Sequence, residues 1–322
     1  MKRLRLVPEV TNIDFFRHAR ITFGASVVAV FLSIGVWFAL GLNFGIDFLG
    51  GTTIRAESST PVDVGAYREA LSPLGLGDIA ISEVFDPSFG ENRHVAMIRI
   101  QAQAGEESVT PEMIAAVEAA LQTIAADMTF PSVESVGPKV SGELITTALI
   151  AVGASLAAIL IYIWLRFEWQ FSVGAIAALV HDVLLTIGLF SLLQIRFDLA
   201  TIAAILTIIG YSINDTVVIF DRLRENLIKY KKRDLQDVMN LSANETLSRT
   251  LMTSGTTLLA LLALLVLGGD VIRSFVFAIF WGVIVGTYSS IYVAKNVVLM
   301  IGVKRDWSKP DQKAGTTFAE KT

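Results

Sequence analysis

Six long apolar stretches divide this chain of 322 residues, and they constrain its fold more than any other feature of the sequence. A helix needs about 20 apolar residues to cross the hydrocarbon layer of a membrane. Hydrophobic residues make up 53% of the chain and charged residues only 17%, which is unusual for a water-soluble globule. The sequence therefore predicts an α-helical polytopic membrane protein with six transmembrane helices, at about residues 21–41, 144–165, 171–193, 198–220, 251–268 and 274–301.

Positive charges are concentrated in three segments outside these stretches. They are residues 1–20, the segment after the fourth stretch, and the segment that begins with Lys304 and Arg305. The positive-inside rule makes all three cytoplasmic and places both termini on the same side of the membrane. We therefore predict a cytoplasmic N-terminus at 1–20, an uncleaved first transmembrane helix at 21–41, a five-helix transmembrane domain at 144–303, and a polar, disordered cytoplasmic tail at 304–322.

The segment 42–143, between the first and second spans, then lies outside the cytoplasm. It is acidic, which does not disturb the orientation because long domains are translocated largely regardless of charge. Its patterns predict the element order β-α-β-β-α-β, with strands at 52–57, 79–85, 94–102 and 133–136 and helices at 63–74 and 111–128. Thr110 and Pro111 are the expected N-cap and first residue of the second helix. This order is typical of a small α+β ferredoxin-like domain.

The cytoplasmic segment 221–248 is highly charged. Within it, Asp234, Leu235, Val238 and Leu241 indicate one amphipathic helix that lies against the membrane surface or a partner. In the sixth span, Gly282 and Gly286 have the G-x-x-x-G spacing that permits close approach of two helices.

The composition also excludes several functions. A net charge of −4 does not suit binding to nucleic acid, which requires a strongly basic surface. The chain contains no cysteine, so it has no disulfide, thiolate metal ligand or cysteine nucleophile. Its three histidines are far apart in sequence, which does not favour a metal cluster. We expect neither a metal nor an organic cofactor.

Two carboxylates lie inside the predicted spans, Asp182 and Asp215. An ionisable side chain at membrane depth is costly unless it is paired or hydrated, so each is a candidate functional residue. Asp215 stands in a polar island of the fourth span that also contains Tyr211 and Asn214. Hydroxyl and amide groups of this kind can hold a proton or a water molecule, which makes Asp215 the first candidate for proton transfer.

Arg249, at the entrance to the fifth span, is the expected partner of Asp215, because an antiparallel hairpin places both at a similar depth. Arginine stays charged, so it stabilises the ionised carboxylate and loses that interaction when the acid takes up a proton. Thr253 follows on the same helix and is a candidate lining residue. The alternatives are a static buried pair that fixes helix register and ordinary helix–helix hydrogen bonding by the threonine.

His181 and Asp182 are adjacent in the third span and form a second candidate relay. Histidine titrates near neutral pH, which suits proton transfer. The alternative is that this pair only forms hydrogen bonds to neighbouring helices. We therefore rank it below Asp215 and Arg249.

Seven fragments, in this order and spacing, resemble the SecF family, the partner of SecD within the resistance-nodulation-division superfamily. The first, residues 45–52, resembles that family's G-x-D-F-x-G-G-T signature. The resemblance extends from Phe15 to Val303, nearly the whole chain. The remaining fragments are residues 136–144, 166–169, 178–182, 210–218, 220–222 and 245–250.

The resemblance implies a subunit that joins SecD and the SecYEG channel in the bacterial inner membrane. There it would use the proton-motive force to help draw preproteins across after the SecA ATPase begins their transport. The family's relay aspartate and arginine fall on Asp215 and Arg249. A further relay aspartate belongs to SecD, and the exterior domain is expected to move as protonation changes helix packing. YajC, YidC and membrane lipid complete the expected partners.

Three other functions compete with this interpretation. A proton-coupled half-exporter of small molecules or lipids from the same superfamily is disfavoured, because the exterior segment is small and shows no aromatic-rich pocket. An intramembrane aspartyl protease using Asp182 and Asp215 is disfavoured, because no G-x-G-D motif surrounds either residue. A purely structural translocon subunit stays open.

Overall fold

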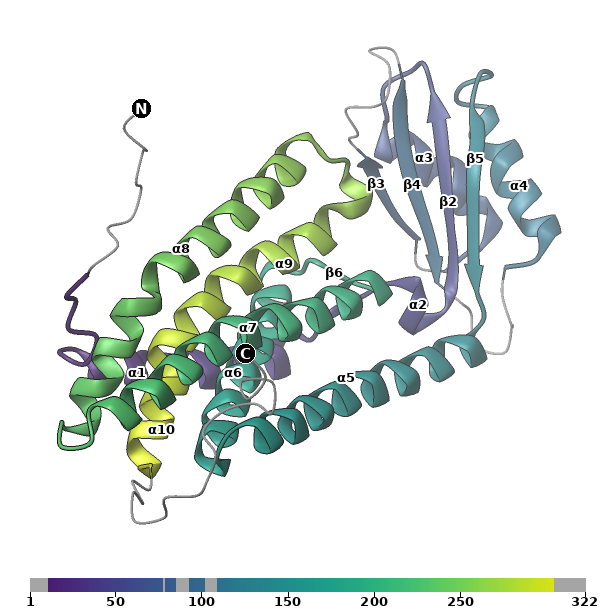
Figure 1. Ribbon diagram of the computed structural model, residues 1–322. Coiled ribbons are helices and arrows are strands. Elements are labelled where there is room, and N and C mark those ends of the chain that lie inside the picture. The colour runs from purple at the N-terminus through teal and green to yellow at the C-terminus, as the bar shows by residue number, and fades with distance from the viewer. Residues whose placement is uncertain (1–10, 78, 85–92, 102–108, 304–322) are drawn as a thin grey trace, which may run out of the picture.

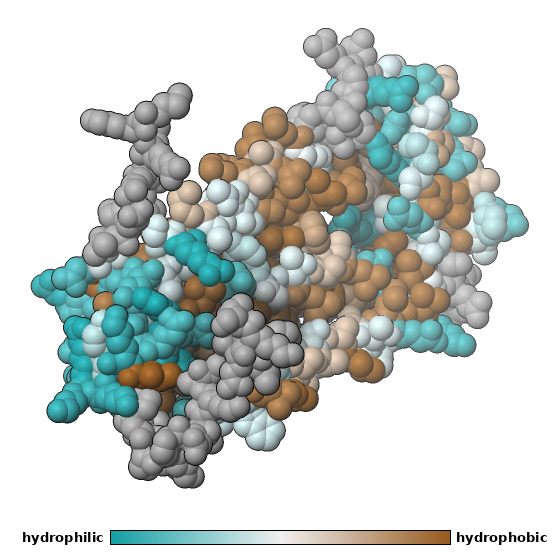
Figure 2. All heavy atoms as spheres, viewed as in Figure 1, coloured by the Kyte–Doolittle hydropathy of each residue, from teal (hydrophilic) through white to brown (hydrophobic). Residues whose placement is uncertain are grey.

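The computed structural model describes residues 11–77, 79–84, 93–101 and 109–303 of the chain. Figure 1 shows a bundle of long helices with a small sheet domain beyond one of its ends. In the space-filling view, hydrophobic residues dominate the helical part, and hydrophilic residues gather at the far end of the bundle and on the sheet domain (Figure 2). This distribution is the one expected for a protein that crosses a lipid layer. The predicted segments 1–10 and 304–322 lie outside the described residues.

Six helical spans in the described part are long and apolar enough to cross a membrane. The first five are single helices: α1 (Ala19–Leu40), α5 (Pro138–Arg166), α6 (Trp169–Leu193), α7 (Leu199–Lys229) and α8 (Leu235–Leu267). The sixth joins α9 (Asp270–Ser289), the π-helical turn η2 (Ser290–Ala294) and α10 (Lys295–Ile301). The predicted fold class, a polytopic helical membrane protein with a small sheet domain, is confirmed.

The prediction of a separate amphipathic helix in 221–248 is wrong. Residues up to Lys229 belong to α7, and residues from Leu235 onward belong to α8, which Asp234 caps by accepting from the Gln236 amide. The charged side chains of this hairpin bond across it: Glu245 accepts from Arg222 at 2.7 Å and from Asn226 at 2.6 Å. The apolar side chains that suggested membrane contact instead face the protein core, where Val238 is fully buried.

The exterior domain contains a four-stranded antiparallel sheet in the order β3-β4-β2-β5. Its strands are β2 (Gly51–Ser58), β3 (Ile79–Val84), β4 (His94–Gln101) and β5 (Thr129–Val136). Helices α3 (Val64–Leu71), followed by the turn η1 (Ser72–Leu74), and α4 (Pro111–Gln122) pack against one face. The predicted element order is therefore present, whereas the ferredoxin-like assignment stays a prediction.

The alternation of buried residues along β4 and the N-cap of α4 are present at the residues that the sequence indicated. Ala96, Ile98 and Ile100 alternate along β4 and are all buried in the core beneath the helices. The Thr110 hydroxyl accepts from the Met113 amide and caps α4, as predicted. That helix ends at Gln122 rather than at residue 128, because the chain turns there to begin β5.

A short linker connects the exterior domain to the transmembrane bundle. It consists of β1 (Asn43–Phe44), which pairs in parallel with β6 (Arg196–Phe197), and the single turn α2 (Ile46–Leu49). The Asp47 carboxylate accepts from the Leu199 amide at 3.0 Å, at the first turn of α7. Gly50 and Gly51 have positive φ angles of 73° and 130°, which lets the chain reverse directly into β2.

Small residues set the closest helix contacts in the bundle. A methyl group at Gly282 of α9 would overlap Ile208 of α7, and one at Gly286 would press on Ser212. The G-x-x-x-G spacing thus supports helix packing, as the sequence indicated. Gly188 of α6 lies directly against the backbone of Ser33 in α1.

We predict that Gly188→Ala destabilises the protein. Because its added methyl group would overlap the Cβ, Oγ and Cα atoms of Ser33, helices α1 and α6 must move apart. The expected loss is about 1–3 kcal/mol in the free energy of unfolding, measured by denaturation in mixed detergent micelles. Gly35→Ala on α1 is the matched control, since a methyl there meets nothing within 4 Å. Equal stability of the two variants would contradict this account of the α1–α6 contact.

Candidate functional site

The Asp182 carboxylate joins three transmembrane helices near the centre of the bundle. It lies on α6 and is 1% exposed. Its Oδ2 atom accepts from the Ser212 hydroxyl of α7 at 2.6 Å and from the Ser289 hydroxyl of α9 at 2.8 Å. Its Oδ1 atom lies 2.9 Å from Nδ1 of His181. A carboxylate can accept about four hydrogen bonds, so these three partners satisfy most of the hydrogen-bonding capacity of Asp182.

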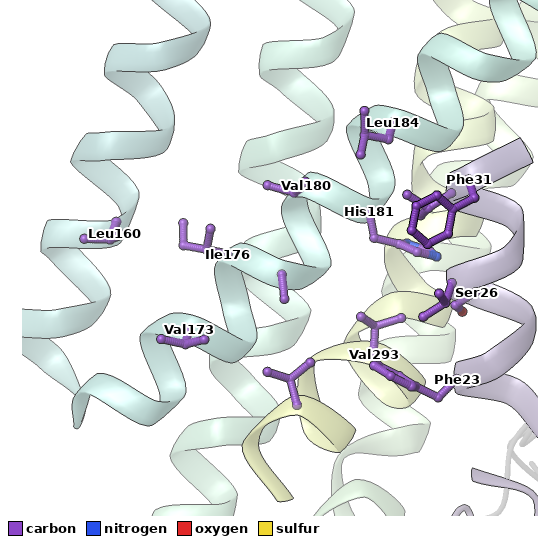
Figure 3. Close-up of a pocket in the computed structure, with 14 residues that line it drawn as sticks. Phe23, Ser26, Phe31, Leu160, Val173, Ile176, Val180, His181, Leu184 and Val293 are labelled. Carbon is purple, nitrogen blue, oxygen red and sulfur yellow. The ribbon is translucent and has the colours of Figure 1, made fainter. Parts of the chain in front are cut away.

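His181 occupies the boundary between this network and an apolar pocket. Its ring stacks on Tyr288 of α9 at a centroid distance of 6.3 Å, and its Nε2 atom is buried without a hydrogen-bond partner among the described residues. The pocket, of about 480 Å³, lies between α1, α5, α6 and the end of the sixth span. Figure 3 shows the His181 ring near Ser26 and Phe31 of α1, with Val180 and Leu184 on its own helix.

Asp215 is buried as well, at 3% exposure, but it is held by far fewer contacts. Its Oδ2 atom lies 3.5 Å from the Ser254 hydroxyl of α8, at the limit of a hydrogen bond. That hydroxyl also bonds to Thr287 of α9 at 2.7 Å. A buried carboxyl group with one weak donor gains little compensation for its lost hydration.

Arg249 lies close enough to Asp215 for electrostatic attraction, yet the two form no ion pair within 4.0 Å. The direct contact that the sequence suggested is therefore absent. Arg249 is instead exposed on the outer surface of α8. The structure thus places the two residues on neighbouring helices, with the carboxyl group inside the bundle and the guanidinium at its edge.

The remaining predicted residues lie around this pair. Tyr211 donates to the Thr257 hydroxyl at 3.3 Å and links α7 to α8. Asn214 is exposed on α7. Thr253 is exposed on α8, and its hydroxyl bonds back to the Arg249 carbonyl at 3.1 Å, an ordinary intrahelical contact. Asn214, Arg249 and Thr253 are thus three polar residues on the outer surface of α7 and α8, and we call them the polar outer face.

Hydroxyl groups connect the surroundings of the two carboxylates. Thr216 of α7 bonds to Ser290 at 2.8 Å, and Ser290 also lies 3.4 Å from the Ser212 carbonyl. Ser290 begins the π-helical turn η2. Single π-helical turns inside α-helices are frequent at functional sites, because they leave backbone groups less rigidly paired.

Several residues of this region were missed by the sequence interpretation. Ser289 and Ser290 complete the hydroxyl network, and their signal is a pair of polar residues in a strongly apolar span. Lys295 is 1% exposed, and its ammonium group lies 4.0 Å from the centre of the Phe16 ring, a cation–π distance. In the described ranges, no group of three or more His, Asp or Glu side chains is arranged to hold a metal ion.

Comparison with known proteins identifies the family of this chain. Residues 116–304 match the sequence profile of the family described as protein export membrane protein SecD/SecF, C-terminal, and residues 35–62 match the SecD/SecF GG motif. The chain belongs to the SecD/SecF family. The second match contains Gly50 and Gly51, which form the reversal into β2.

Two relatives cover nearly the whole chain. A protein translocase subunit SecF from Cereibacter sphaeroides is 66% identical over 317 residues, which are 98% of this chain and 98% of that protein. Another from Rhodobacter capsulatus is 62% identical over 315 residues, which are 96% of this chain and 95% of that protein.

Solved structures of the SecD/SecF family have the same fold. The crystal structure of SecDF from Thermus thermophilus, a translocon-associated membrane protein, is 38% identical with a TM-score of 0.81. A SecDF structure in a super-membrane-facing form is 39% identical with a TM-score of 0.68. Each comparison covers 92% of this chain but only 39% of the SecDF chain.

We predict that the two carboxylates contribute very differently to stability. Asp182→Ala leaves two buried hydroxyl groups and His181 without an acceptor, so the free energy of unfolding should fall by about 3 kcal/mol. Asp215→Ala removes one weak hydrogen bond and should cost less than about 1.5 kcal/mol. Denaturation in mixed detergent micelles measures both values. A larger loss for Asp215→Ala would contradict the contacts described for the two residues.

Proposed function

We propose that the chain is a SecF-type subunit that acts with SecD to promote preprotein translocation across the bacterial inner membrane, driven by the proton-motive force. Its full-length relatives are named as protein translocase subunits SecF. The other proposed partners are the SecYEG channel with SecA, and also YajC and YidC. Both termini lie in the cytoplasm and the sheet domain lies outside it in this proposal, which the distribution of positive charges in the sequence supports.

The observation that carries the proposal is the state of Asp215. This carboxylic acid is buried in a membrane-spanning helix with a single weak hydrogen bond, and a cationic side chain lies at the edge of the same site. Deprotonation strengthens the attraction to Arg249, whereas protonation removes it. One proton taken up or released therefore changes the force between α7 and α8.

The available energy is adequate for this change. One elementary charge that crosses a potential of about 100 mV releases roughly 2.3 kcal/mol. A differential interaction of a few kcal/mol is enough to shift a two-state equilibrium substantially. Because Asp215 has few contacts to lose, little of that energy is needed to break existing hydrogen bonds.

The polar outer face of Asn214, Arg249 and Thr253 supports a helical partner at this position. An arginine at the edge of the hydrocarbon layer is unfavourable against lipid and is stabilised when another protein covers it. The SecDF chains in the solved structures extend far beyond the part that matches this chain. SecD is therefore the proposed partner against α7 and α8.

The linker provides a route from Asp215 to the exterior domain. Helix α7 carries Asp215, and its first turn bonds to Asp47 in α2, the turn that precedes strand β2. The strand pair β1–β6 makes a second connection at the same place. A tilt of α7 would therefore be transmitted to the exterior sheet, which would be the part that handles the preprotein.

The competing functions have less support. A half-exporter needs a substrate pocket, but the pocket beside His181 is lined almost entirely by apolar side chains and includes no residue of the Asp215 site. A protease needs two facing carboxylates, whereas Asp182 and Asp215 are engaged by separate sets of hydroxyl groups. A purely structural role for Asp215 is tested by the next experiment.

We predict that Asp215→Asn abolishes the part of preprotein translocation that depends on the proton-motive force. The amide keeps the size of the carboxyl group but cannot be ionised, so the interaction with Arg249 no longer changes. The measurement is transport of a preprotein into inverted membrane vesicles, with and without a proton gradient. Asp221→Asn is the matched control, since Asp221 lies on the same helix and pairs with Arg166 at its cytoplasmic end.

Co-purification with SecD distinguishes the outcomes of this experiment. A variant that assembles with SecD but shows no response to the gradient supports the proposal. A variant that assembles and responds normally leaves only a structural role for Asp215 and refutes proton transfer through it.

We also predict that Arg249→Lys reduces gradient-dependent transport without abolishing it. Lysine keeps the positive charge but lacks the planar guanidinium, so attraction at a distance survives while any directed hydrogen bonds to a partner are lost. Arg249→Gln should remove the response altogether. The same vesicle assay measures both variants, and an unchanged response in Arg249→Gln would exclude this charge from the mechanism.

A further inference from the structure

A second pocket lies between the exterior sheet and the linker, far from Asp215. It has a volume of about 340 Å³. Figure 1 shows α2, whose residues line part of it, just below the lower ends of β2 and β4. One part of its lining is polar and is formed by Asn43 of β1, Arg99 and Gln101 of β4, and Gln194, the residue that caps α6. The other part is apolar and includes Leu42, Phe44 and Leu49.

Arg99 is the unusual residue of this pocket. It is half-buried on the sheet face opposite α3 and α4, and its guanidinium forms no hydrogen bond or ion pair with the described residues. Burial lowers the pKa of Arg99 and the nearby charge of Arg196 lowers it further, whereas Asp198 raises it by a smaller amount. The positive charge is therefore held at a cost that a bound anion would relieve.

The neighbouring charges do not supply that anion. Asp198 lies 3.0 Å from Arg196 and also caps α7 by accepting from the Thr201 amide. Asp47 accepts from the Leu199 amide. Each of these carboxylates already has a partner, so the attraction of Asp198 compensates the charge of Arg99 only in part. Its five N–H donors suit a phosphate group, which accepts two parallel hydrogen bonds from arginine.

The apolar lining identifies the kind of molecule that carries this phosphate. Leu49 is 49% exposed and Phe44 is 36% exposed at the pocket rim. They follow directly after α1, whose last turns expose Phe38 and Leu40 to the surrounding lipid. The pocket is thus polar on the side of the sheet and continuous with the lipid-facing surface on the other. A free phosphate ion would use only the polar side.

We propose that this pocket binds an anionic phospholipid, with its phosphate group at Arg99 and the upper part of its acyl chains against Leu42, Phe44 and Leu49. The lipid connects β4 of the exterior domain to the linker beside α1. It would thereby hold the exterior sheet at a defined position over the membrane. The proposal is independent of proton transfer, because no residue of this pocket belongs to the Asp215 site.

The test is lipid binding to the purified, delipidated full chain in detergent, followed by native mass spectrometry. The probe is dioleoyl phosphatidylglycerol, and dioleoyl phosphatidylcholine has the same chains without net charge. The wild type should retain one tightly bound phosphatidylglycerol in preference to phosphatidylcholine. Arg99→Ala should weaken that binding by about tenfold or more, the loss expected for charge-assisted hydrogen bonds. Arg99→Lys should show an intermediate loss.

Arg68→Ala is the matched control, since Arg68 is exposed on α3 and its loss changes the net charge equally. It should leave the bound lipid in place. Thermal unfolding followed by tryptophan fluorescence verifies that each variant is folded, and Arg99→Lys decides the result should Arg99→Ala not fold. Unchanged phosphatidylglycerol binding in the Arg99 variants would overturn the proposal. Displacement by inorganic phosphate at the lipid's own concentration would overturn the assignment to lipid.

Discussion

The hydrogen bonds to the Asp182 carboxylate are the interaction on which the rest of the bundle depends. They join α6, α7 and α9 at one depth, where lipid offers no alternative partners for the two serine hydroxyls. Close packing at Gly282 and Gly286 brings α9 against α7 and so permits the short distances to Ser212 and Ser289. The carboxylate, the serine hydroxyls and the glycines therefore act together. The glycines permit the close packing of α7 and α9, and this packing brings the hydroxyls within hydrogen-bond distance of Asp182.

Against this fixed centre, Asp215 is loosely held. It lies three residues after Ser212 on α7, so both side chains project from nearly the same side of the helix. One carboxylate accepts two strong hydrogen bonds from hydroxyls and the other accepts one at 3.5 Å. The two acids of this bundle thus have different environments, and under the proposed function only the loosely held one changes its protonation state.

The sequence predicted the spans, the exterior domain and its strands, because apolar length and alternation are local properties that lipid and a sheet core both enforce. It also pointed to Asp215, since a carboxylate in an apolar run is conspicuous. It could not predict the hydrogen-bond partners of Asp182 on the other helices. Ser289 is 107 residues away from that aspartate, and only the packing of α9 brings it near. The hairpin at 221–248 was misinterpreted for the same reason: its amphipathic pattern fits a membrane surface as well as a neighbouring helix, and only the position of α8 decides between them.

The contrast between the two carboxylates also limits how α7 can move under the proposed function. Ser212 ties the helix to Asp182, so a change in the force at Asp215 acts just beyond a fixed point. Helix α7 would then tilt about Ser212 rather than slide. The part of α7 between Ser212 and Leu199, at the end nearer the exterior domain, would move with this tilt. Because Leu199 bonds to Asp47 and β6 pairs with β1, the tilt is delivered to the segment that enters the exterior sheet. A small displacement near the cytoplasmic side is thereby enlarged where the exterior domain is attached.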